Sequence, residues 1–132
     1  MNNLGLGTIS FHLAEILSKH GYKKYSPVQY SKRDNGYFVL KLTFDECALI
    51  ETSGKIELIY APTINETFEW LSKNYPEWNV CVIWDTNVKG YYFSVQNIET
   101  NYDYRMPTSP GEMDKNKMFE WGIEHVLNRL DD

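Results

Sequence analysis

Apolar and polar positions along this chain repeat with two different periods, which predict helices and strands. Three segments have the spacing of about 3.6 residues that is typical of helices. They span about residues 9 to 20, the residues after Thr63, and the residues from Ser109 to about Leu130. Gly21 follows the first segment, as expected after a helix C-terminus. Thr63 with Glu66, and Ser109 with Glu112, have the spacing of capping boxes, which predicts where the other two helices begin.

The segments between the helices are rich in Val, Ile, Tyr and Phe, and three turn signals divide them into hairpins. The turns are Asn35-Gly36, Ser53-Gly54 and Val88-Lys89-Gly90. Because short connections join antiparallel strands, the sequence predicts an α+β fold with an antiparallel sheet built from three β-hairpins and three helices, in the order α-ββ-ββ-α-ββ-α. The stretch Glu99–Thr108 shows no clear period and is predicted to be a loop packed by its own aromatic residues.

A weak internal repeat relates the two halves of the chain. When the chain is shifted by 54 residues, "EILSKHGYKKYSPVQYSKRDNGY" aligns without a gap on "EWLSKNYPEWNVCVIWDTNVKGY", with seven identities in 23 positions. The alignment matches a helix, a hairpin turn and a second strand in both copies. It predicts an αββ pseudo-repeat, although separate use of similar elements would give the same pattern.

The last predicted helix has two apolar stripes. The main stripe contains Phe119, Ile123, Val126, Leu127 and Leu130. The second contains Met118, Trp121 and His125, roughly 140° away at about 100° per residue. A helix with two apolar faces is covered on both, either by its own fold or by another chain. The leading interpretation is therefore a protein–protein interaction or assembly module, which forms a homodimer or binds another protein through this stripe.

Gly122 lies between the two stripes and costs the helix about 1 kcal/mol relative to alanine. It is explained most simply by close approach of another backbone. That neighbour is predicted to be either a strand of the same sheet or a symmetric helix.

The alternative interpretation is a small-molecule binding domain, because Trp and Tyr combine apolar area with polar groups. Its ligand-binding residues would be Trp78, Trp84, Tyr91 and Tyr92 in and beside the hairpin around Gly90. This interpretation requires that two or more of these side chains point into one cavity.

Length, composition and net charge limit the number of domains, the partners and the location that we expect for this chain. A length of 132 residues with 42% hydrophobic residues predicts a single globular domain over residues 1–132. The net charge of −5 disfavours duplex nucleic acid as a partner, because that binding depends on basic surfaces. We expect a cytoplasmic protein with two reduced thiols, Cys47 and Cys81, since neither a secretory signal nor an apolar run near 18 residues is present.

No constellation of residues points to catalysis. The three histidines all fall on predicted helices, and no spacing of Cys and His suggests a zinc site. Asp45-Glu46 is expected to be a turn between two strands. The sequence therefore predicts no catalytic residue, no metal and no cofactor, and an enzyme remains only the third interpretation.

Three segments, "YAPTINETFEWLSKNY", "GYYFSV" and "MFEWGIEHVLNRL", resemble parts of small uncharacterised proteins encoded by phages, prophages and mobile elements of gut bacteria. The resemblance covers about residues 60–130. Those proteins typically combine an Ala-Pro-Thr start, a Trp-Leu helix, a hairpin and a final helix. The resemblance implies this arrangement of elements but carries no activity and no site residues.

Overall fold

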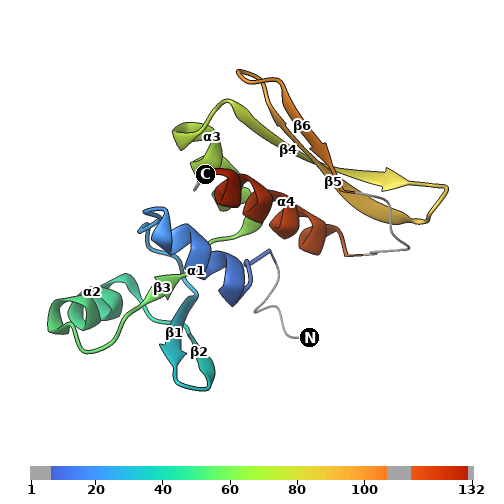
Figure 1. The fold of residues 1–132 in the computed structure, drawn as a ribbon. Helices are drawn as coiled ribbons and strands as arrows, with labels where there is room; N and C mark the ends of the chain where they lie inside the picture. Colours follow the sequence, from blue (N-terminus) through green and yellow to red (C-terminus); the bar gives the residue numbers. More distant parts are fainter. Residues whose placement is uncertain (1–6, 107–113, 131–132) are drawn as a thin grey trace. The chain divides into compact units, whose positions relative to one another are not determined.

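The computed structural model describes residues 7–106 and 114–130, which form four helices and two three-stranded antiparallel sheets (Figure 1). The α+β class is confirmed, whereas one sheet built from three hairpins is wrong. The chain divides into two compact units, Met1–Thr63 and Ile64–Asp132, which are described separately. The prediction of a single domain stays a prediction.

The first unit begins with helix α1 (Phe11–Lys19) and the hairpin of strands β1 (Gln29–Arg33) and β2 (Gly36–Leu40). The side chain of Ser10 accepts a hydrogen bond from the Leu13 amide and so caps α1. The hairpin turn is Asp34-Asn35, one residue earlier than predicted, because Arg33 pairs with Gly36. Strand β3 (Ile59–Tyr60) pairs with β1, so β2 is an edge strand in the order β2-β1-β3.

Helix α2 (Phe44–Ser53) occupies part of the segment predicted to be the second hairpin. The run from Cys47 to Thr52, predicted to be a strand, is helical. Local signals determine the helix: Thr43 and Glu46 form a complete capping box, and Gly54 caps the C-terminus in the left-handed region at φ 66°. Asp45 and Glu46, expected to be turn residues, lie in the first helical turn, where the helix dipole favours them.

A buried glutamine connects β1 to the start of α2. The Gln29 side chain is fully buried, its Nε2 donates to the carbonyl of Ser26, and its Oε1 accepts from the Leu42 amide at 2.9 Å. A second donation from Nε2 reaches the Leu42 carbonyl at 3.2 Å. These bonds hold the end of the hairpin next to Thr43, the N-cap of α2.

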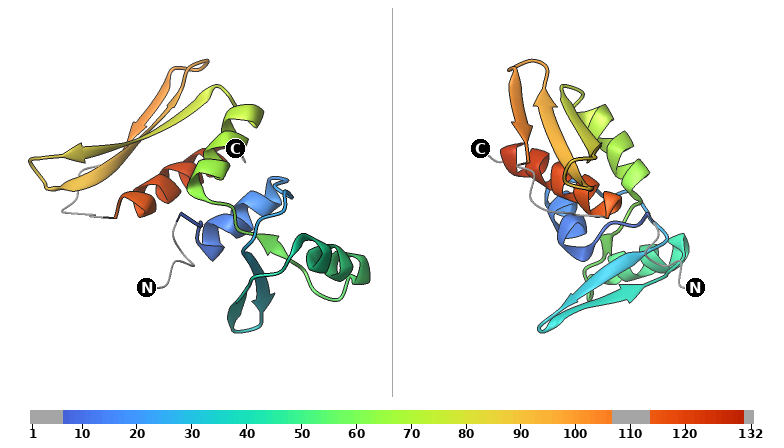
Figure 2. Two further views of the ribbon diagram at one scale, coloured as in Figure 1. Left: turned by 180° about the vertical axis from the view of Figure 1, so that it is seen from behind. Right: turned by 90° about the vertical axis from the view of Figure 1, so that its right-hand side faces the viewer.

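The second unit begins with α3 (Ile64–Asn74), followed by β4 (Trp78–Asp85), β5 (Gly90–Asn97), β6 (Tyr102–Arg105) and α4 (Lys115–Leu130). The strands form an antiparallel sheet in the order β4-β5-β6. Figure 2 shows, in two further views, α4 running along one face of this sheet.

Two predictions for this unit need correction. The stretch Glu99–Thr108 contains strand β6, which pairs with β5 through Tyr102↔Asn97 and Tyr104↔Val95. Helix α4 begins at Lys115, and Asp114 caps it by accepting from the Asn116 amide at 3.0 Å. The cap predicted from Ser109 to Glu112 lies outside the described residues.

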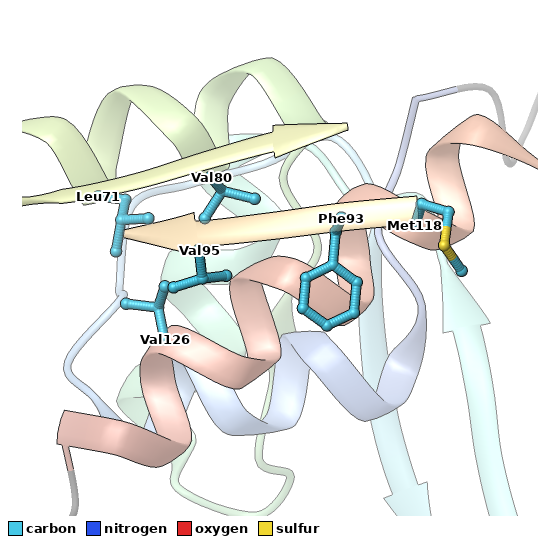
Figure 3. Close-up of a cluster of buried hydrophobic side chains, with 6 residues drawn as sticks. All are labelled: Leu71, Val80, Phe93, Val95, Met118 and Val126. Carbon is cyan, nitrogen blue, oxygen red and sulfur yellow. The ribbon is translucent and has the colours of Figure 1, made fainter. Parts of the chain in front are cut away.

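The core of the second unit lies between the sheet and α4. Figure 3 shows six of its buried side chains: Leu71, Val80, Phe93, Val95, Met118 and Val126. A Cβ atom added to Gly122 would lie 2.6 Å from Val80 Cγ1 and 3.5 Å from Phe93 Cβ. The close neighbour of Gly122 is therefore the sheet of its own unit.

The elements of the proposed pseudo-repeat are present in both units, each of which begins with a helix and two antiparallel strands. Gly36 and Gly90, aligned by the 54-residue shift, both begin the second strand of their hairpins. The third strands differ, because β3 adds beside β1 whereas β6 adds beside β5. The repeated part thus ends with the hairpin.

Candidate functional site

The aromatic residues predicted to bind a ligand are divided between the two faces of the β4-β5-β6 sheet, and their role in binding stays a prediction. Because side chains alternate along a strand, Trp78, Trp84 and Tyr91 lie on the face of the sheet that α4 covers, whereas Tyr92 lies on the opposite face. Trp84 contacts Tyr91 edge-on at 5.0 Å between ring centroids, and Trp78 contacts Tyr102 at 5.7 Å. These two pairs sit at opposite ends of the hairpin.

The second stripe of α4 packs within its own unit. Met118 is fully buried and belongs to the core cluster, and Trp121 packs against the same cluster. His125 stacks on Tyr104 with ring centroids 4.2 Å apart. Met118 therefore adds no area to an intermolecular contact, and we do not place the candidate interface on this stripe.

His125 of α4 contacts an aromatic and a charged side chain that affect its protonation. Its Nε2 lies 2.7 Å from the Tyr102 hydroxyl, and the guanidinium of Arg129 lies 4.4 Å from the centroid of the Tyr102 ring. Burial, followed by the positive charge of Arg129, lowers the pKa of His125 below its ordinary value of 6.5. The folded unit therefore favours the neutral imidazole.

Acidification is expected to weaken the second unit. Because the pKa of His125 is lower in the folded state, the unfolded chain binds more protons below pH 6.5. The stability that neutral His125 contributes is fully present above pH 6.5, and it is lost as the pH falls through the pKa of His125 in the folded state. All four tryptophans lie in the second unit, so tryptophan fluorescence reports its unfolding. The urea concentration at the midpoint of unfolding should be lower at about pH 5.5 than at about pH 7.5.

His125→Gln is the control for this titration, since the other two histidines, His12 and His20, lie in the first unit. The variant should lose most of the change in midpoint over that pH range. An unchanged pH dependence in the variant would show that other groups cause it.

Exposed apolar side chains concentrate in one short segment of the first unit. Among the described residues, eight large hydrophobic side chains are exposed, and six of them belong to residues 37–56. We call these six the β2–α2 surface: Tyr37, Phe38, Val39, Phe44, Leu49 and Ile56. Three of them, Tyr37, Phe38 and Val39, are consecutive in β2, and neighbouring exposed apolar side chains are typical of a surface that contacts a partner.

Strand β2 is exposed on both of its faces. Tyr37 stacks on Phe11 of α1 at 4.4 Å, yet it remains 48% exposed. Phe38 points to the other face, where the Arg33 guanidinium lies 5.1 Å from its ring centroid, and is 56% exposed. Among the described elements β2 contacts mainly β1, so no packed layer covers either of its faces.

Helix α2 carries further exposed apolar side chains. Cys47 is its one buried residue, whereas Phe44 is 64% and Leu49 is 72% exposed. Phe44 contacts Tyr25 edge-on at 5.7 Å between ring centroids. Local capping therefore stabilises a helix that buries little of its own apolar area. The sequence signal for this surface was the run Tyr37-Phe38-Val39, which is apolar at consecutive positions and so cannot face a single core.

Comparisons of the chain with protein-family models, curated proteins and solved structures find no match. The resemblance to small proteins of phages and mobile elements therefore stays a prediction. In the described ranges, 7–106 and 114–130, no helix combines the length and apolarity needed to cross a membrane. Within those same ranges, no three His, Cys, Asp or Glu side chains come together as ligands for a metal ion.

Proposed function

We propose that this chain is a protein–protein interaction module and that it pairs with a second copy of itself through strand β2. The clustering of six of the eight exposed large hydrophobic side chains within residues 37–56 carries the proposal. Burial of such side chains between two chains is favourable by roughly 25 cal/mol for each Å² of apolar surface.

Strand addition is the mode of contact that suits β2. An edge strand presents backbone N–H and C=O groups that a second strand can pair with. Two identical edges pair about a two-fold axis, in which each residue i meets residue j and each residue j meets residue i. The contact therefore needs no second kind of surface.

Phe38 is the central residue of β2, so we place the two-fold axis of the pair there. Antiparallel pairing centred on Phe38 sets Phe38 opposite Phe38 and Tyr37 opposite Val39, so the central contacts are apolar. It also sets Gly36 opposite Leu40, so all five residues of β2 take part in the pairing.

Light scattering after gel filtration, over a wide range of protein concentration, tests the proposal. We expect the mass of the wild-type chain to rise from that of a monomer to that of a dimer as concentration increases. A constant monomer mass up to the solubility limit would rule out pairing with a second copy.

A further inference from the structure

A cavity of about 450 Å³ lies within the first unit, away from strand β2. Its lining comes from the last turn of α1, the C-terminal part of α2 and the segment that leads into β3. Cavities of roughly 300 to 1,000 Å³ are the usual size for small-molecule sites.

Aromatic and aliphatic side chains form one part of the lining. Tyr22 is 3% and Tyr60 is 9% exposed, and Ile56 and Leu58 lie beside them in the lining. The Tyr60 hydroxyl donates a hydrogen bond to the Glu51 carboxylate. Burial, followed by the hydrogen bond to Glu51, raises the pKa of Tyr60, so the phenol remains a donor and orients this carboxylate.

The polar part of the lining carries more negative than positive charge. The charged residues of the lining are two glutamates, Glu51 and Glu57, and one lysine, Lys23. Gly54, the C-cap of α2, also lies in the lining, and the last turn of α2 contains no basic residue. Because a helix C-terminus carries a partial negative charge, α2 makes the cavity more favourable for a cation.

We propose that this cavity binds a small organic cation in which a protonated amine is attached to an apolar body. The amine donates to the carboxylates of Glu51 and Glu57, and the apolar body packs against Leu58 and the tyrosine rings. Aromatic rings also attract a nearby cation through their π electrons. The amine could belong to a simple amine or to an amino acid, whose carboxylate would meet Lys23.

Three probes with the same phenyl group separate these chemistries: phenethylamine, phenylalanine and 3-phenylpropionate. Each is titrated into the full ¹⁵N-labelled chain, and the amide signals are followed by NMR. We expect saturable shifts at Glu51, Gly54 and Leu58 with a probe that carries an amine, and none with 3-phenylpropionate. Tighter binding of phenylalanine than of phenethylamine would identify an amino acid, and the reverse order a simple amine.

Glu57→Gln tests the role of charge without disturbing the Tyr60–Glu51 hydrogen bond, and Glu99→Gln is an exposed control in the second unit. The first variant should weaken amine binding about tenfold, as expected for loss of one charge-assisted hydrogen bond, and the control should leave it unchanged. The proposal is overturned if neither amine gives saturable shifts, if 3-phenylpropionate binds equally well, or if Glu57→Gln binds as tightly as the wild type.

Discussion

Replacement of Gly122 by alanine is expected to destabilise the second unit, although alanine is the better helix former. The new Cβ would lie 2.6 Å from Val80 Cγ1, much closer than carbon atoms pack. Valine is stiff at χ1, and Val80 is 9% exposed within the core, so it has little room to move. Overpacking of this kind costs about 1–3 kcal/mol, and it opposes a gain of about 1 kcal/mol in helix propensity.

The measurement is urea unfolding of wild type and Gly122→Ala, followed by tryptophan fluorescence. The same substitution in a Val80→Ala background is the matched control, because it removes the atom that clashes. There, alanine at position 122 should become neutral or stabilising. Equal effects in both backgrounds would mean that Val80 is not the cause.

Phe38→Lys is expected to prevent formation of the proposed dimer. In the register centred on Phe38, the two new lysines would lie directly opposite each other across the axis, where like charges repel. Charged residues on edge strands are also a common device against strand pairing in natural proteins. Because Phe38 is 56% exposed, the change should leave the fold of the first unit almost unaffected.

Ile98→Lys is the matched control, since Ile98 is 72% exposed and follows β5 in the second unit. Light scattering should report a monomer for Phe38→Lys at concentrations where wild type and Ile98→Lys are dimers. Circular dichroism of the three proteins should coincide. A Phe38→Lys dimer would place the contact elsewhere on the chain.

Features of the fold with local causes could be predicted from the sequence. Helices α1 and α3 and the two hairpins have clear periodicity, caps and turn residues, and all of them form close to the expected positions. Helix α2 had the same kind of signal in Thr43, Glu46 and Gly54. It was missed because the run of apolar residues between them outweighed the caps. Strand β6 was missed although Tyr102-Asp103-Tyr104-Arg105 alternates as a strand should.

The candidate surface could not be predicted, because exposure depends on which elements become neighbours. Met118 and Phe38 are both large apolar residues within apolar patterns, yet one is fully buried and the other is 56% exposed. The difference arises because the β4-β5-β6 sheet packs on α4, whereas no packed layer of the described chain covers the faces of β2. Which elements pack on each other is a tertiary property.

Disulfide cross-linking through a cysteine at position 38 tests the pairing of β2 with β2 most directly. Phe38→Cys is made in a Cys81→Ser background, because Cys81 is exposed whereas Cys47 is buried. Opposed residues of antiparallel strands have Cα atoms about 4.5–5.5 Å apart, which suits a disulfide. Under mild oxidation we expect a covalent dimer of Phe38→Cys and little from the control Ile98→Cys. Cross-linking of the control alone, or of neither protein, would contradict pairing through β2.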